Sequence, residues 1–194
     1  MFLLAHAGIT LGVAYALERA VNHQPVNNRP AGGPADSPVD PAPLRVDYRF
    51  ILLGALLPDL VDKPLGHILL PAVLANSRTF LHTLLFLVLT MLAAFIIYRR
   101  KRAMWGVYIA FGVLMHLIMD AMWCDPVTFF WPLYGPFQKY PGISEWILEK
   151  WIQALFEEPC VYIPEAAGFL ILLFFAIRLV LQRKVRAFIS RGNL

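Results

Sequence analysis

The sequence predicts an all-α protein, a multi-pass bundle of about five membrane-spanning helices, one short or broken, with an amphipathic helix at the membrane surface. Hydrophobic residues make up 59% of the 194-residue chain and charged residues only 15%, and the mean hydropathy is +0.61. Soluble proteins contain about a quarter charged residues and could not bury so much apolar surface. At about 20 residues per span, residues 1–194 form one membrane-embedded domain, with no room for a separate soluble domain.

The formal charge of +4 does not indicate a nucleic-acid partner. The basic residues gather in short runs beside apolar stretches, notably at 99–102 and 183–191. Short basic loops are typical of the cytoplasmic side of membrane proteins, whereas a nucleic-acid interface needs a broad basic face. The charge pattern therefore predicts membrane topology and excludes a nucleic-acid-binding surface.

The first apolar stretch, residues 1–17, is expected to be a retained helix. Its length and the Ala14-Tyr15-Ala16 near its end also match a cleavable signal peptide, but it lacks a basic start and carries His6 within the apolar run. Residues 22–44 are rich in Pro, Gly, Asn and Asp, which predicts a flexible linker.

Three apolar segments follow the linker. The first, at 50–61, is interrupted by Pro58 and predicts a short or broken span. Residues 80–98 and 103–123 each have the length of a span. The tight basic turn between them makes these two helices antiparallel neighbours.

The last third of the chain combines a surface helix with a final span. In residues 144–156, apolar side chains recur every four positions between polar ones, which predicts an amphipathic helix in the membrane interface. A last span is expected at 160–181. Cys124 and Cys160 fall at the predicted outer border of the membrane, where they form a disulfide, serve as small apolar residues or act as soft metal ligands.

Lysine and arginine residues also orient the predicted bundle. The basic loop at 99–102 and the basic C-terminal tail are expected in the cytoplasm, and we assign the arginines that flank the linker to the same side. The helix ends that carry intramembrane His and Asp residues then reach the extracytoplasmic face. These residues are His6, Asp59, Asp62, His82, His116 and Asp120.

Ionisable side chains within apolar helices are costly unless they are paired, ligated or hydrated, so each is a candidate functional residue. His116 and Asp120, at i and i+4, share a helix face and could ligate one ion or two adjacent ions. A buried His–Asp hydrogen bond explains this pair equally well. Asp59 and Asp62, at i and i+3, also share a face, and their alternative role is to cap a helix start.

The remaining candidates are weaker as single residues. His82 could be a packed helix residue hydrogen-bonded to a neighbour, His6 could simply lie at the membrane interface, and Arg78 could be an interfacial anchor. Arg78 and Lys63 are also placed to hold an anionic substrate beside a metal. Three His and three Asp at one depth would be a costly set if unpaired, but around a metal they satisfy one another.

The order of these motifs resembles that of the YdjM-type inner-membrane metal-dependent hydrolases. That family has an N-terminal His, a Pro-Asp-x-x-Asp-like motif, an Arg-Gly-x-x-His-Ser-like motif, a His-x-x-x-Asp motif and then Trp-Pro. The family is itself distantly similar to zinc-dependent phospholipase C and P1-type nucleases. The matching residues here are His6, Pro58-Asp59-Leu60-Val61-Asp62, Arg78-Thr79-Phe80-Leu81-His82-Thr83, His116-Leu117-Ile118-Met119-Asp120 and Trp131-Pro132.

The resemblance implies a location in a prokaryotic inner membrane and a set of metal ligands. The implied ligands are His6, Asp59, His82, His116 and Asp120, with Asp62 as a ligand or a nearby base. Thr79 and Thr83 stand where the family has Gly and Ser. The phospholipase-like enzymes carry a later His-x-x-x-Glu pair, but no histidine follows His116 in this chain. One or two metal ions are therefore expected instead of three. Of the late acidic residues Glu157, Glu158 and Glu165, the last is the strongest candidate for a further ligand.

The residues and the resemblance together predict a metal-dependent hydrolase that cleaves a phosphoester of a lipid or lipid-linked substrate. Zinc suits the mixed ligands, and manganese or iron would also fit. A bound metal activates water by lowering its pKa to about 7. Lys63 and Arg78 would clamp the phosphate while Asp62 or Asp120 positions the water. The competing interpretations are a non-catalytic metal-binding protein, either transporter or scaffold, and a metal-free adaptor.

Overall fold

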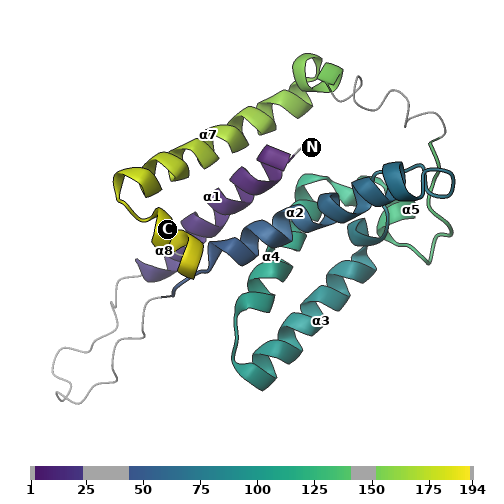
Figure 1. The fold of residues 1–194 in the computed structure, drawn as a ribbon. Coiled ribbons are helices and arrows are strands. Elements are labelled where there is room, and N and C mark those ends of the chain that lie inside the picture. The colour runs from purple at the N-terminus through teal and green to yellow at the C-terminus, as the bar shows by residue number, and fades with distance from the viewer. Residues whose placement is uncertain (1–2, 24–43, 141–151, 193–194) are drawn as a thin grey trace, which may run out of the picture.

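The structure is a computed structural model that describes residues 3–23, 44–140 and 152–192. All regular elements within these ranges are helical, as predicted (Figure 1). The predicted linker at 22–44 lies almost wholly outside the described residues, as does most of the predicted interfacial helix at 144–156, of which the described part from residue 152 to 157 is helical. The α-helices are α1 (Leu3–Asn22), α2 (Tyr48–Pro64), α3 (Leu84–Lys101), α4 (Trp105–Met119), α5 (Pro126–Phe129), α7 (Pro159–Leu181) and α8 (Val185–Arg191).

Helix α2 is short but unbroken. It runs through Pro58 and continues into the π-helical turn η1 (Leu65–Leu69), so of the two predicted alternatives, a short or a broken segment, the structure has the short one. A proline removes one backbone hydrogen bond, and this loss is tolerated where neighbouring helices support both sides of the residue. Pro58 is buried, and α2 packs against both α1 and α4.

Helix α3 begins later than the sequence predicts. The Thr83 hydroxyl accepts a hydrogen bond from the Phe86 N–H at 3.0 Å, which caps the helix and sets its first residue at Leu84. The preceding residues, Phe80–His82, form the 3₁₀ turn η2. His82 therefore lies on a turn before the helix, and not on the helix as expected.

Two pairs of glycines bring the central helices into close contact. A Cβ atom on Gly54 of α2 would lie 2.2 Å from the Ile109 carbonyl oxygen of α4, and one on Gly112 would lie 2.4 Å from the Ile51 carbonyl oxygen. A Cβ atom on Gly8 of α1 would likewise lie 2.1 Å from the Gly168 oxygen of α7. Only glycine allows the backbones of two helices to approach this closely.

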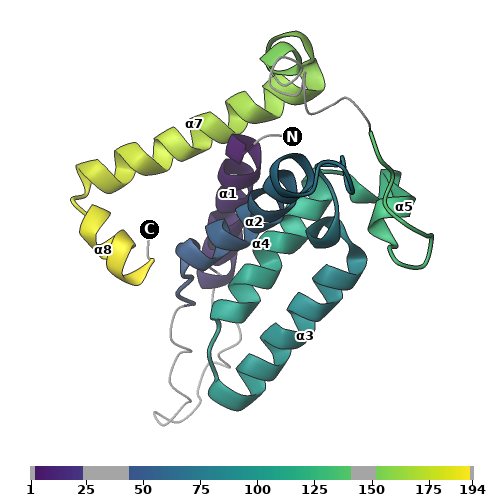
Figure 2. The same ribbon diagram turned by 45° about the vertical axis from the view of Figure 1, so that its right-hand side comes forward.

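The elements form two packed pairs joined through α1 and α2. In both views α7 lies beside α1, and α3 lies beside α4 (Figures 1 and 2). One buried cluster, which includes Leu11, Tyr48 and Phe175, joins α1, α2 and α7. A second cluster around Val113 and Leu117 joins α4 to α3. Helix α2 therefore connects the α1–α7 pair to the α3–α4 pair. Its C-terminal part carries Asp59 and Asp62.

Among the described residues, only α7 has both the length and the hydropathy of a membrane span, and α4 is a shorter apolar helix. The predicted last span is therefore confirmed as a helix, whereas the bundle of about five spans is not. Cys124 and Cys160 are exposed and free, so they do not form the disulfide considered above. Large apolar side chains are exposed along α3 and α7, as at Leu89 and Leu170.

Candidate metal centre

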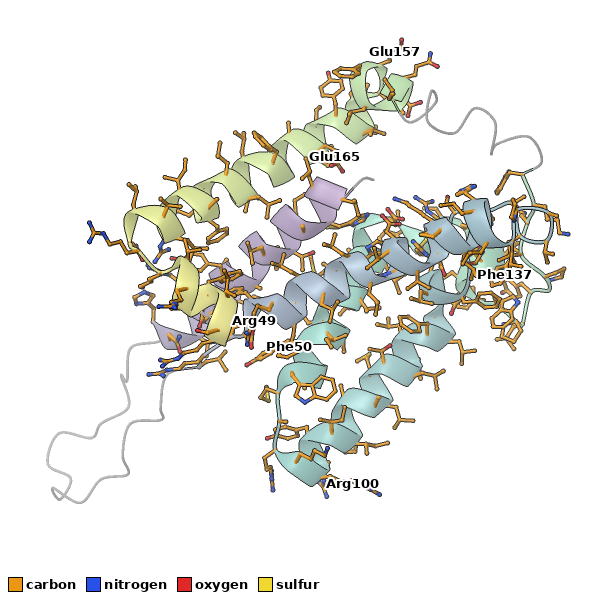
Figure 3. The ribbon with its side chains drawn as sticks, viewed as in Figure 1. Arg49, Phe50, Arg100, Phe137, Glu157 and Glu165 are labelled. Atoms are coloured by element: carbon orange, nitrogen blue, oxygen red, sulfur yellow. The ribbon has the colours of Figure 1, made fainter. Side chains whose placement is uncertain are left out.

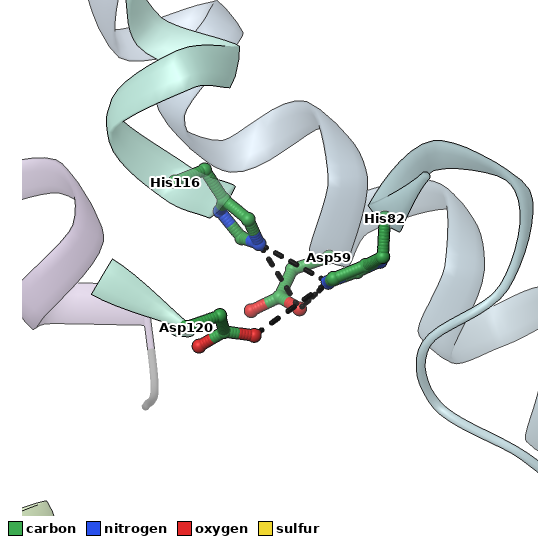
Figure 4. Close-up of side chains that lie close together, drawn as sticks. All are labelled: Asp59, His82, His116 and Asp120. Carbon is green, nitrogen blue, oxygen red and sulfur yellow. Dashed lines mark hydrogen bonds and ion pairs between the residues drawn. The ribbon is translucent and has the colours of Figure 1, made fainter. Parts of the chain in front are cut away.

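Four side chains from three elements meet near the C-terminal ends of α2 and α4 (Figure 4). Each offers one ligand atom, and the four atoms all lie within 4.8 Å of one another. Asp59 comes from α2, His82 from η2, His116 from the last turn of α4, and Asp120 from the residue that ends α4. Both imidazole side chains are fully buried and the carboxylates nearly so.

The backbone of α2 fixes the orientation of His116. The Nδ1 atom of this ring lies 2.7 Å from the Ala55 carbonyl oxygen. A carbonyl oxygen only accepts hydrogen bonds, so Nδ1 carries the proton and donates it. In the neutral ring, Nε2 then presents its lone pair to the other three side chains.

Asp62 fixes the orientation of His82. Its Oδ2 atom lies 2.7 Å from His82 Nδ1 and accepts hydrogen bonds from the Thr79 N–H at 2.9 Å and the Leu81 N–H at 3.0 Å. A carboxylate that accepts from the far nitrogen of a histidine is the usual support of a metal-binding imidazole. The structure therefore places Asp62 behind His82, with its Oδ2 occupied by three donors.

The loop before α3 holds these donors in place. The Asn76 side chain accepts a hydrogen bond from the Arg78 N–H at 2.9 Å, and the Thr83 hydroxyl donates to the Phe80 carbonyl at 2.8 Å. A Cβ atom on Gly66 of η1 would lie 1.8 Å from the Asn76 carbonyl oxygen, so η1 packs directly on the loop backbone. These contacts fix the turn that points His82 at His116.

The four ligand atoms face one another. His82 Nε2 lies 3.2 Å from His116 Nε2, and in the neutral rings both atoms present lone pairs, because each Nδ1 carries the proton. Asp59 Oδ1 lies 3.5 Å from His82 Nε2 and 3.8 Å from His116 Nε2, and Asp120 Oδ2 lies 3.7 Å from His82 Nε2.

These distances fit a shared divalent cation. Ligand atoms at 2.0–2.2 Å from a tetrahedral zinc ion lie roughly 3.3–3.6 Å from one another. Two lone pairs and two carboxylates at such separations repel one another, and a divalent cation among them would offset this repulsion. The donor set of two imidazoles and two carboxylates suits zinc, manganese or iron equally.

His6 adds a fifth donor beside this group. Its Nε2 lies 3.2 Å from Asp120 Oδ1, and its ring stacks on His116 at 4.0 Å between centroids. Both ring nitrogens are buried, and neither makes a hydrogen bond among the described residues. A buried imidazole nitrogen that faces a carboxylate outside hydrogen-bonding geometry would suit a metal ligand, so His6 could help to hold a second ion beside Asp120.

Two cations lie at the edge of the site. Lys63 Nζ lies 2.6 Å from Asp59 Oδ2, and Arg78 Nε lies 3.0 Å from Asp120 Oδ2. The Arg78 side chain is 37% exposed and that of Lys63 is 21% exposed, whereas the carboxylates they contact are buried. The groups that reach the surface at this edge of the site are therefore the two cations.

Glu165 lies elsewhere. Its Oε2 accepts hydrogen bonds from the Leu4 N–H at 3.1 Å and the Ala5 N–H at 3.3 Å, at the first turn of α1. A carboxylate there satisfies N–H groups that have no partner within the helix. Glu157 and Glu158 are exposed and do not belong to the four-residue group. None of the three glutamates Glu157, Glu158 and Glu165 therefore belongs to the four-residue metal group.

Two alternative explanations from the sequence are wrong. Asp59 and Asp62 lie in the last two turns of α2, so they do not cap a helix start. His116 donates to Ala55, and no hydrogen bond to Asp120 accounts for its burial. The Ala55 carbonyl was missed as the partner of His116, and only the glycine at the neighbouring position 54 hinted that this backbone lies close to another helix.

The profile of a family described as YdjM inner membrane protein matches residues 1–188 of the chain. No curated protein and no solved structure gives a match.

Proposed function

Because this chain belongs to the YdjM inner membrane protein family, we propose that it is a membrane-embedded, metal-dependent hydrolase that cleaves a phosphoester of a lipid or lipid-linked substrate. The observation that carries the proposal is the 3.2 Å approach of His82 Nε2 and His116 Nε2 between two carboxylates. Such a donor set is suited to hold a divalent ion. The adjoining cations, Lys63 and Arg78, supply positive charge and N–H donors for a phosphate group.

Asp59, His82, His116 and Asp120 would hold the first ion, and His6 with Asp120 a second. A divalent ion bound there would polarise a phosphoryl oxygen and make water nucleophilic near neutral pH. The chain's own contribution is to keep both histidines in the correct tautomer. Asp62 does so for His82, and the Ala55 carbonyl does so for His116.

Lys63 and Arg78 would hold the phosphate. Each contacts one carboxylate of the metal group and is partly exposed. An arginine has five N–H donors, and the Nε contact to Asp120 uses one of them. A phosphate bound between these two cations lies next to the carboxylates that face the metal position.

Asp120 is the better candidate to position the attacking water. Asp62 Oδ2 already accepts three hydrogen bonds, and the side chain is fully buried behind His82. Asp120 contacts the partly exposed Arg78 through Oδ2 and His6 through Oδ1. We therefore assign the water-positioning role to Asp120 and an orienting role to Asp62.

We also propose that the site lies near the extracytoplasmic face of the inner membrane and that the C-terminus is cytoplasmic. Figure 3 shows Arg49 and Arg100 at the opposite end of the molecule from Phe137 and Glu165. Helix α8 lies at the end with Arg49, whose guanidinium donates to the Ile189 carbonyl at 2.8 Å. Basic residues at one end and the site at the other support this orientation.

The test is turnover of bis-p-nitrophenyl phosphate and of phospholipids by the purified protein, before and after chelation of metal. We expect activity that chelation abolishes, that added zinc or manganese restores, and that His116→Ala eliminates. His23→Ala is the matched control, because His23 is exposed at the end of α1 away from the site. A His116→Ala protein with full activity would contradict the proposal, and metal binding without any turnover would favour a transporter or scaffold.

A further inference from the structure

An apolar cavity of about 700 Å³ opens directly beside the candidate metal centre. Asp59, which belongs to the metal group, also lines this cavity, as does Lys63. The rest of the wall is mainly apolar and comes from the start of α1, the end of α2 with η1, and the segment before α7. Its apolar residues include Leu3, Leu4, Leu60, Ile68, Ile152 and Leu155.

The proposed chemistry uses only one end of this cavity. The Lys63 ammonium and the Asp59 carboxylate lie together at that end, 2.6 Å apart. Glu165, which also lines the cavity, has one carboxylate oxygen bonded to the N–H groups of Leu4 and Ala5. A ligand that fills the cavity therefore needs an anionic group near Lys63 and an uncharged apolar body beyond it.

We propose that this cavity holds the hydrocarbon chain of the substrate, so that the substrate is an amphiphile with a long alkyl or acyl chain close to the scissile phosphate. The inference rests on the proposed function, because that function places the phosphate at Lys63 and Arg78. The cavity volume is within the range of ligand sites, about 300–1,000 Å³. Membership of an inner membrane family supplies the source of such molecules.

The hydrocarbon chain of the ligand contributes binding affinity in proportion to its length. Each buried methylene group adds favourable free energy, so binding strengthens with chain length until the cavity is filled. Short phosphoesters would be held only by the cations and the metal position. The cavity thus selects lipids over soluble phosphate esters of the same headgroup chemistry.

The experiment uses photoreactive alkyl phosphonates, which resist phosphoester hydrolysis and carry a diazirine near the chain end. Butyl, octyl, dodecyl and hexadecyl probes are incubated with the full-length protein in lipid nanodiscs, and labelled residues are identified by mass spectrometry. We expect dodecyl and hexadecyl probes to label the cavity wall near Leu60, Ile68 and Leu155, and the butyl probe not to label it.

Two tryptophan substitutions fill the cavity, and a third is the control. Leu60→Trp and Ile68→Trp replace exposed wall residues, so neither disturbs the buried core. Each should lower labelling by the dodecyl probe at least about tenfold. Leu89→Trp, on the exposed face of α3, should leave labelling unchanged.

Competition separates substrate binding from ordinary lipid contact. Unlabelled dodecyl phosphonate should suppress labelling, and dodecanol, which lacks the phosphonate, should not. Equal competition by dodecanol, or labelling that Leu60→Trp and Ile68→Trp both leave intact, would overturn the proposal. Because labelling needs no turnover, specific labelling without hydrolysis would refute the proposed function alone, and hydrolysis that is indifferent to chain length would refute the cavity proposal alone.

Discussion

His82 and His116 approach each other through their Nε2 atoms at 3.2 Å, although each ring has already committed its Nδ1 proton to another acceptor. In their neutral forms the two rings present lone pairs to each other at this distance, with the carboxylates of Asp59 and Asp120 beside them, an arrangement that a bound cation would stabilise.

Replacing Asp62 by Asn should weaken metal binding without removing a ligand. The Asp62 carboxylate accepts from His82 Nδ1 and thereby holds the tautomer whose Nε2 is free to bind metal. We expect metal affinity, measured by competition with a chelator, to fall about 10–100-fold. Asp47→Asn is the control, because Asp47 caps α2 and pairs with Arg49 at the opposite end of that helix. Equal losses in both variants would argue against the orienting role.

Lys63→Gln should separate phosphate binding from metal binding. Removing the ammonium deletes a charge-assisted contact to phosphate, and inorganic phosphate should inhibit about tenfold less strongly. Metal content should be unchanged, because Lys63 contacts the Oδ2 atom of Asp59 whereas Oδ1 faces the histidines. The exposed Lys184 provides the matched control, Lys184→Gln. An unchanged inhibition constant in Lys63→Gln would remove Lys63 from the phosphate site.

Glu165→Ala should lower stability and leave metal content intact. The Glu165 carboxylate accepts from two N–H groups at the first turn of α1, and loss of such a cap reduces the free energy of unfolding by about 1 kcal/mol. The measurements are the melting temperature and the metal content of the variant. Loss of metal at an unchanged melting temperature would show instead that Glu165 is a ligand, as the sequence suggested.

Gly8→Ala and Gly12→Ala should differ sharply although both residues lie on α1 facing α7. A Cβ atom at Gly8 would lie 2.1 Å from the Gly168 carbonyl oxygen, whereas one at Gly12 would lie 3.4 Å from the Ile171 side chain. We expect Gly8→Ala to reduce stability by about 1–3 kcal/mol and Gly12→Ala to have little effect. Thermal unfolding in detergent compares the two, and equal melting temperatures would contradict the α1–α7 packing described here.

The sequence anticipated the helical class and the residues that meet at the site better than it anticipated the elements that carry them. His6, Asp59, Asp62, His82, His116 and Asp120 could be singled out because charged groups stand out in apolar segments. The start of α3 was misplaced because the Thr83 cap lies within an otherwise apolar run. Apolar periodicity cannot detect a single capping hydroxyl.

The roles within the site depend on backbone contacts that a single sequence does not reveal. Asp62 could not be assigned as a ligand or a supporting residue until the Thr79 and Leu81 N–H groups were seen to converge on its Oδ2. Glu165 was expected near the metal because it is acidic and within a span, but its partner is the backbone of α1. Residue type indicates which side chains need partners, and only the fold shows which partners they have.

The most direct test of the central claim is the metal content of the purified protein, measured by elemental analysis after exposure to zinc and manganese. We expect about one or two divalent ions per chain in the wild type. We expect almost none in a His82→Ala, His116→Ala double variant, with His23→Ala retaining the wild-type content. A folded wild-type protein that binds no divalent ion would contradict the metal centre, and so would a double variant that keeps its full complement.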